Sequence, residues 1–225
     1  MRLTLATYNI HRCIGVDGRY DPARISEVLQ ELDADLLALQ EVDAPGHHGL
    51  ELLYRLAEEV KLTPIAGPTL LERKGHCGNA ILTRCAPQDV RLIDLSQPRR
   101  EPRGAIDLDV MCERERLQVI AAHLGLKPSE RRVQVEHLLT HFGTKHCVLM
   151  GDFNEWFLWG RPLRWIKAIF GYTPALRTFP SPFPVFALDR IWVRPAATVM
   201  QMQVHKTALS LKASDHLPLK ATIEW

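Results

Sequence analysis

The 225-residue sequence predicts an α/β fold in which two packed β-sheets carry helices on their outer faces. Short strand-like runs outnumber helical segments by roughly three to one, which is too many strands for a simple doubly wound sheet. Several of these runs alternate apolar and polar residues, as half-buried strands do. Others, such as residues 147–150, are continuously apolar and suit a strand covered on both faces. Two packed sheets with outer helices use both kinds of strand.

The strand predictions rest on runs of β-branched and aliphatic residues bounded by turn-forming residues. The predicted strands are residues 3–10, 35–42, 79–83, 90–95, 105–111, 117–124, 147–151, 188–193 and 217–225.

Three helices are predicted between the strands. Asp21 and Pro22 fit the N-cap and first position of a helix, and apolar residues then follow at helical spacing as far as Leu32. A second helix covers about 48–60, and a third begins at Pro128-Ser129 and continues to about 141. Neither a repeat nor a low-complexity linker divides the chain, so residues 1–225 are predicted to form a single domain.

The composition is that of a globular protein, with 46% hydrophobic and 24% charged residues. It excludes a disordered, collagen-like or disulfide-scaffold chain. The net charge is +2, without the basic excess of a protein that coats DNA. No run approaches the ~18 apolar residues of a membrane span, and the N-terminus lacks the features of a signal peptide. A soluble, cytoplasmic protein is therefore expected.

The five cysteines are scattered and never form a CxxC pair. They are Cys13, Cys77, Cys85, Cys112 and Cys147. An odd number of separated cysteines predicts free thiols in a reducing compartment.

Polar side chains stand at the ends of the predicted strands, where stacked-sheet folds place binding groups. Each one alone has a structural interpretation, as a turn former, a solvated terminus or a satisfied histidine. Seven such places in one chain indicate a shared cleft. The residues are Asn9, His11, Glu41, Asn79, His123, Asp152, Asn154, Asp189, Asp215 and His216.

Together the surrounding motifs resemble the endonuclease/exonuclease/phosphatase superfamily of metal-dependent phosphoesterases. They follow the order of that family from residue 7 to residue 219. The resemblance implies a DNase I-like, four-layer α/β/β/α sandwich with the active site at one edge of the two sheets. The motifs are TYNIH (7–11), LQEV (39–42), GNAILTR (78–84), AAHL (121–124), GDFNE (151–155), LDRIWV (188–193) and SDHLPL (214–219).

A phosphoesterase must neutralise the charge around phosphorus and stabilise the leaving oxygen. Hard cations such as Mg²⁺ or Mn²⁺ prefer oxygen ligands, and the closely spaced histidines or cysteines of a zinc site are absent. The resemblance implies that Glu41 is the principal metal ligand, that Asn9 contacts metal or phosphate beside it, and that Asp215 lies near metal and water.

The resemblance also implies the catalytic roles. Asp152 orients or deprotonates the attacking water, and Asn154 donates to a phosphate oxygen. His123 lies near the leaving group, where its expected role is to protonate the leaving oxygen. His216 contacts the phosphate and is aligned by Asp189, which favours the protonated imidazole.

Three further residues are expected to bind phosphate or substrate. His11 stands where some members of the family carry an acidic residue of the metal site, which weakens the case for a second metal. Asn79 is expected to hold a substrate loop. Arg103 is either a bidentate phosphate clamp or a solvated loop cation.

The sequence indicates the class of reaction more clearly than it indicates the substrate. Residues 156–172 hold three of the five tryptophans among cations, which suits a membrane interface, a lipid-like ester or stacking on nucleobases. A helix packed on a sheet with solvated cations explains the same pattern. We expect a small or lipid-like phosphodiester as substrate. The alternatives are a DNA nuclease with the same core, which the charge does not favour, and a binding module without catalysis.

Overall fold

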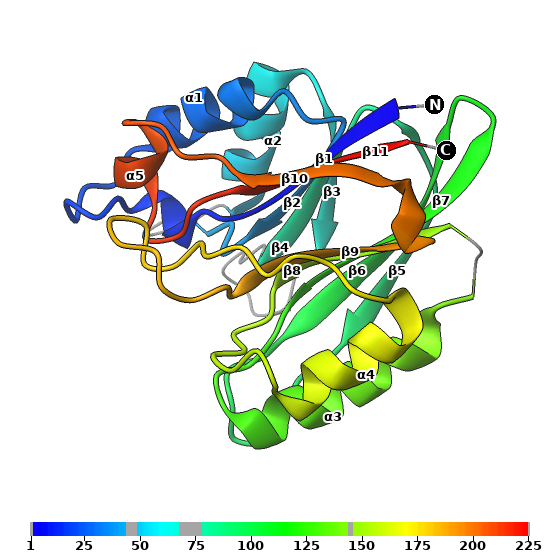
Figure 1. Ribbon diagram of the computed structural model, residues 1–225. Helices are drawn as coiled ribbons and strands as arrows, with labels where there is room; N and C mark the ends of the chain where they lie inside the picture. The colour runs from blue at the N-terminus through cyan, green and yellow to red at the C-terminus, as the bar shows by residue number, and fades with distance from the viewer. Residues whose placement is uncertain (1, 44–48, 68–77, 144–145, 225) are drawn as a thin grey trace.

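The computed structural model describes residues 2–43, 49–67, 78–143 and 146–224. Its layers run helix, sheet, sheet, helix (Figure 1). The predicted four-layer α/β/β/α architecture is therefore confirmed. No helix among the described residues combines the length and the apolar character that a membrane crossing requires.

Within the described residues, the first sheet has six strands, in the order β10 (Val199–Val204), β11 (Leu219–Glu224), β1 (Arg2–Asn9), β2 (Leu36–Gln40), β4 (Asn79–Thr83) and β3 (Thr63–Gly67). The second has five, in the order β5 (Ala86–Asp94), β6 (Gly104–Cys112), β7 (Glu115–His123), β8 (Cys147–Asp152) and β9 (Asp189–Arg194). Both sheets are mixed: β1–β2 and β7–β8 pair in parallel, whereas the other pairs are antiparallel.

Helices α1 (Pro22–Leu32) and α2 (Gly49–Val60) pack their apolar faces on the six-stranded sheet. Asp21 caps α1 as predicted, because its side chain accepts a hydrogen bond of 3.2 Å from the backbone N–H of Arg24. Helices α3 (Pro128–Leu138) and α4 (Arg161–Phe170) cover the five-stranded sheet. The facing sides of the two sheets enclose a third apolar cluster between them.

Four further elements are short. They are the 3₁₀ turns η1 (His11–Cys13), η2 (Leu139–His141) and η3 (Ala196–Thr198), and the single-turn helix α5 (Ser210–Ala213).

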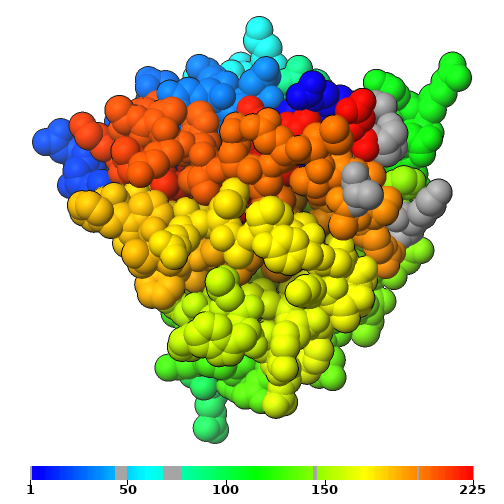
Figure 2. Space-filling view, in the orientation of Figure 1, coloured from blue at the N-terminus to red at the C-terminus, as the bar shows by residue number. Residues whose placement is uncertain are grey.

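Segment 156–172 divides into two parts. Its second part forms α4, which buries Leu163, Ile166 and Phe170 against the sheet while Arg164 and Lys167 face solvent. This matches the interpretation of a packed helix with solvated cations. Residues 156–159 precede α4 and are exposed. The space-filling view shows the yellow and gold surface that the chain forms around this segment (Figure 2).

The prediction that all cysteines are free thiols is wrong. Cys85 and Cys112 form a disulfide, with their Cα atoms 5.0 Å apart. The reason is the strand register, since β5 and β6 pair Ala86 with Met111 and so bring the two flanking cysteines together. Cys13 and Cys147 are free and buried. Cys77 lies outside the described residues.

One row of residues crosses three neighbouring strands at the end of the second sheet. His123 of β7 pairs with Asp152 of β8, and Asp152 pairs with Asp189 of β9. Gly151 precedes this row at a φ of +144°, where a Cβ atom would stand 1.9 Å from the carbonyl oxygen of Ala122. Only glycine allows β7 and β8 to approach so closely beside the row.

Candidate active site

The predicted site residues converge at one edge of the molecule because strands from both sheets end there. β1 ends at Asn9 and its parallel neighbour β2 ends just before Glu41. In the second sheet, β7 ends at His123 and β8 ends at Asp152. Hydrogen bonding between Asn9 and Asp152 joins the two sheets at this edge.

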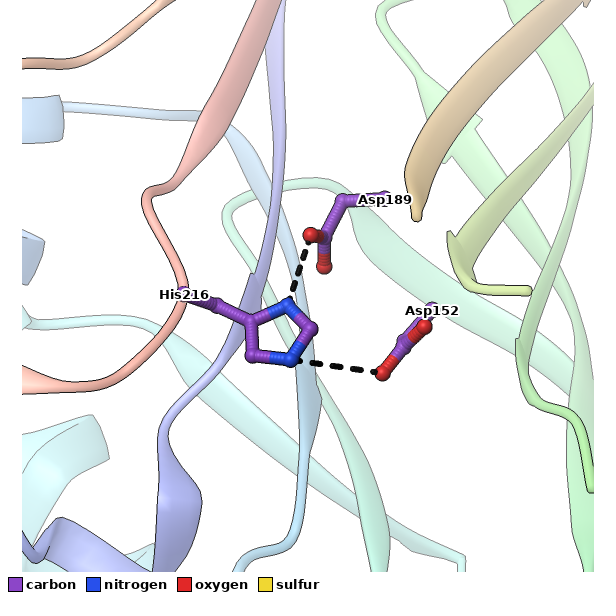
Figure 3. A group of neighbouring side chains, drawn as sticks. All are labelled: Asp152, Asp189 and His216. Carbon is purple, nitrogen blue, oxygen red and sulfur yellow. Dashed lines mark hydrogen bonds and ion pairs between the residues drawn. The ribbon is translucent and has the colours of Figure 1, made fainter. Parts of the chain in front are cut away.

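Asp152 is the centre of the cluster, and it is 1% exposed. Its Oδ2 atom lies 3.1 Å from Asn9 Nδ2, 3.6 Å from His123 Nε2 and 3.8 Å from His216 Nε2. Figure 3 shows the carboxylate of Asp152 facing one ring nitrogen of His216 and that of Asp189 facing the other. A carboxylate surrounded by two imidazoles and an amide can hold and accept the proton of a water molecule.

His216 is held between two carboxylates. Its Nδ1 atom lies 2.8 Å from Asp189 Oδ2, which also accepts a 2.6 Å hydrogen bond from the hydroxyl of Thr178. Burial lowers the pKa of His216, but the charges of Asp189 and Asp152 outweigh this effect and raise it to about 10. This pKa corresponds to a buried imidazolium at neutral pH.

His123 has the opposite electrostatic environment. Burial and the nearby charge of Arg103 lower the pKa of His123 to about 3, so its ring is neutral. Arg103 Nη1 lies 3.1 Å from His123 Nδ1, while Arg103 Nη2 donates to Glu101 at 2.8 Å. Since Arg103 is only 8% exposed, it is a fixed part of the site and not a solvated loop cation.

Three predicted site residues have left-handed backbone conformations, which non-glycine residues rarely adopt. The φ angle is +45° at His11, +55° at Glu41 and +48° at Asn154. The backbone N–H of Asn154 donates to Asp152 Oδ1 at 2.9 Å, and its side-chain amide donates to the carbonyl of Leu124 at 3.0 Å. Such conformations cost about 1–3 kcal/mol and concentrate at functional sites.

The expected metal ligands lie on the β1 side of the cluster. Asn9 Nδ2 donates to Glu41 Oε1 at 3.1 Å as well as to Asp152, so the two carboxylates face one donor. Asp215 lies 3.6 Å from the ring of His11, whose backbone N–H donates to Asn9 Oδ1 at 3.0 Å. Asp215 therefore connects to the cluster through His11 and Asn9.

A second possible metal group combines Asp152, Asp189 and His216, whose ligand atoms lie within 4.8 Å of one another. In this structure the Oδ2 atom of Asp189 already accepts hydrogen bonds from Thr178 and from the ring of His216.

Asn79 is the first residue of β4 and is buried. Its buried amide donates to the carbonyl of Gly104 at 2.7 Å and so ties β4 to the start of β6, next to Arg103.

Sequence reasoning missed five residues that support the site. Thr178 bonds Asp189, and the ring of Phe179 lies 4.7 Å from that of His216. Both belong to an irregular segment without a periodic signal. Ser214 donates to the carbonyl of Asn9 at 2.8 Å. Arg131 pairs with Glu155 at 3.2 Å. Ser214 and Glu155 could have been found from the motifs SDHLPL and GDFNE, which contain them.

Comparisons with known proteins find similar sequences and similar structures. The uncharacterized protein YbhP of Escherichia coli K12 is 28% identical, over 96% of this chain and 94% of its own length. The mannosyl-6-phosphatase Bt3783 of Bacteroides thetaiotaomicron matches with a TM-score of 0.77 and 19% identity, over 99% of this chain and all of that chain. TDP2 of D. rerio, solved with a single-strand DNA product, matches with a TM-score of 0.71 and 16% identity, over 100% of this chain and 99% of that chain.

Those structural matches show the fold alone, because both identities are below 25%. The family follows from the sequence: the model of the endonuclease/exonuclease/phosphatase family matches residues 6–216, which include every residue of the cluster around Asp152. The chain, with its site at the shared edge of two sheets, therefore belongs to the endonuclease/exonuclease/phosphatase family, whose members hydrolyse phosphoesters.

Proposed function

We propose that this chain is a divalent-metal-dependent phosphodiesterase that hydrolyses a small or lipid-like phosphodiester by in-line attack of water. The arrangement around Asp152 Oδ2 carries the proposal. One carboxylate oxygen there faces an imidazolium at His216, a neutral imidazole at His123 and the amide of Asn9. A base and a cationic stabiliser beside each other are what attack on an anionic phosphorus requires.

Mg²⁺ or Mn²⁺ fits the donor set on the β1 side. We assign Glu41 and Asp215 as the carboxylates that would hold the cation, with Asn9 beside them in contact with metal or phosphate. The amide of Asn9 donates to both Glu41 and Asp152, so this place already favours positive character. The bound cation would offset charge on the phosphate and on the attacking water.

The remaining residues have separate proposed roles in the attack on the phosphate. Asp152 orients the water and takes its proton, and the imidazolium of His216 stabilises charge on the phosphate oxygens. Asn154 and Arg103 supply further donors. The low pKa of His123 favours a hydrogen bond to the leaving oxygen over the proton donation that the family resemblance implied.

Hydrolysis of bis-(p-nitrophenyl) phosphate with Mg²⁺ or Mn²⁺ tests this proposal. We expect Asp152→Ala and Glu41→Ala to lower kcat at least about 100-fold, and EDTA to abolish turnover. Glu113→Ala is the matched control, because Glu113 is an exposed acidic residue in the turn between β6 and β7. Wild-type turnover in either site variant, or in EDTA, would refute the mechanism.

Cleavage of DNA by the same core is the second candidate, favoured by the likeness to TDP2 with its DNA product. Nicking of plasmid or abasic-site DNA that is lost in His216→Ala would support it. The likeness to a mannosyl-6-phosphatase makes monoester turnover a further comparison. Faster hydrolysis of p-nitrophenyl phosphate than of the diester would favour a phosphatase.

A further inference from the structure

Residues 156–188, here named the acid-free segment, contain no aspartate or glutamate. The chain has 26 acidic residues, yet these 33 consecutive residues carry only the cations Arg161, Arg164, Lys167 and Arg177. They also hold nine of the 16 aromatic residues. Although the whole molecule is nearly neutral, this segment is cationic and aromatic at once.

Many of these apolar side chains face solvent. Trp159 is 73% exposed, Tyr172 72% and Phe183 81%. More than half of each side chain is also exposed at Phe157, Leu158 and Val185. The segment covers much of the surface that faces the viewer in Figure 2, in yellow to gold. A gathering of large exposed apolar residues marks a surface that binds something.

The exposed residues connect to the catalytic cluster through stacked rings. Trp156 begins the exposed loop and packs edge-to-face on Phe186, with ring centroids 4.7 Å apart, and on Phe179 at 5.9 Å. Phe179 in turn contacts His216 at 4.7 Å. A partner seated on the exposed loop therefore lies beside the place where the phosphate reacts.

We propose that the acid-free segment docks on an anionic lipid bilayer. Trp159, Phe157 and Phe183 would enter the interfacial region, where aromatic rings are favoured. Arg161, Arg164 and Lys167 are exposed beside them on α4 and face anionic headgroups. Lys167 already lies 5.5 Å from the ring of Tyr172, so cation and aromatic surface are continuous there.

A bilayer fits this surface better than the other candidates. A second copy of the chain would set one acid-free segment against another in a two-fold contact, which brings like charges together. Nucleic acid would use the rings and cations, but the exposed aliphatic residues Leu158 and Val185 gain nothing from base stacking. An anionic lipid surface would contact the aromatic, the aliphatic and the cationic side chains.

Docking of this kind would bring the site to phosphoesters at the bilayer surface. This consequence rests on the proposed phosphodiesterase, and it narrows the substrate to a membrane phosphodiester. Binding to a bilayer needs no turnover, so the two proposals can fail separately.

Co-sedimentation of the full chain with vesicles tests the docking, using phosphatidylcholine with and without phosphatidylglycerol. We expect binding to the anionic vesicles and at least a tenfold loss in the double variant Trp159→Ser/Phe183→Ser. Arg164→Glu/Lys167→Glu should lose the preference for phosphatidylglycerol. Tyr54→Ser and Arg132→Glu are matched controls, because both residues are exposed but lie on α2 and α3. Thermal melting confirms that each variant is folded.

Several outcomes would overturn the docking proposal: no binding of the wild-type chain to anionic vesicles, equal binding by the Trp159→Ser/Phe183→Ser variant, or equal loss in the controls. Binding of a single-stranded oligonucleotide through Trp159 and Phe183 without vesicle binding would assign the surface to nucleic acid. Dimerisation that the same variant abolishes, again without vesicle binding, would assign it to a second copy. Vesicle binding without turnover of any phosphodiester would leave the docking intact and refute the proposed function.

Discussion

Two histidines at the same carboxylate have opposite charge states because their second neighbours differ. His216 has the carboxylate of Asp189 behind it, whereas His123 has the guanidinium of Arg103. The sequence predicts the first pair from its motifs, because Asp189 and His216 belong to the same family pattern. It leaves Arg103 open between a phosphate clamp and a solvated cation, since nothing in the local sequence shows that this loop is buried against His123.

Asp189→Asn should lower kcat about 10–100-fold, because a partner that holds a reacting group typically contributes this much. The substitution also removes the charge that raises the pKa of His216. An NMR titration of the His216 ring checks the cause, with the conservative variant Asp189→Glu as the comparison. An unchanged His216 pKa in Asp189→Asn would contradict this electrostatic role, whatever happens to turnover.

The pH dependence of stability should report the charge of His216. Its folded pKa of about 10 lies above the ordinary value of 6.5, so its contribution is complete below about pH 6.5 and is lost as the pH rises through 10. The unfolding free energy of wild type minus that of His216→Gln should therefore fall between these two pH values. Urea titrations in EDTA measure the difference. If the difference in unfolding free energy grew toward pH 10, the charged form of His216 would not be the one that stabilises the fold.

At the scale of elements, the strongest sequence patterns predicted helices and strands most accurately. The helix that begins at Pro22 forms where the sequence predicts it, and the strands predicted at 3–10 and 147–151 form within one residue of those bounds. Strands β3 and β10 were not predicted, because both are edge strands with weak patterns. β3 contains proline and glycine, and β10 is largely exposed. The single turn α5 is too short to show any periodicity.

Helix α3 supports the site through one buried cation. The Arg131 side chain, which is 1% exposed, pairs with Glu155 and donates to the carbonyls of Gly125 and Leu126. It thus fastens the segments that follow β7 and β8 to one helix. A helical pattern on the sequence shows that such a residue faces inward, but it does not show which loops the residue will meet.

Arg131→Met should lower the free energy of unfolding by about 3–5 kcal/mol, because Glu155 would stay buried without its partner. The double variant Arg131→Met/Glu155→Leu should lose less, since it leaves no unpaired charge. Urea denaturation measures both, and Arg132→Met on the exposed side of α3 is the control. A double variant less stable than the sum of the single ones would argue against a simple ion pair.

At the scale of the whole molecule, the candidate site lies at one end of the two sheets and the disulfide lies at the opposite end. β4 begins at Asn79 and β6 begins at Gly104, both at the end of the sheets that carries the site. Cys112 is the last residue of β6, and Cys85 lies just beyond the last residue of β4. The four layers were predictable because the motifs span nearly the whole chain. The disulfide was not, since its cysteines are 27 residues apart and only the strand register brings them together.

Reduction of the Cys85–Cys112 bridge should lower stability by about 2–4 kcal/mol and leave turnover intact, because the bridge stands at the far end from Asp152. Thermal melting with and without a reductant measures the change. The variant Cys85→Ser/Cys112→Ser is the control, and reductant should not shift its melting further. A loss of turnover on reduction would contradict the separation of bridge and site.

The row of His123, Asp152 and Asp189 also limits how this chain can change over evolution. Because neighbouring positions along a strand point to opposite faces, one inserted or deleted codon inside β8 would turn the Asp152 carboxylate toward the wrong face. Hairpin tips at the far end of the molecule can lengthen without this penalty. We expect length variation among homologues to collect in those tips and to spare the interior of β8, and pairwise gap positions in aligned relatives would show whether it does.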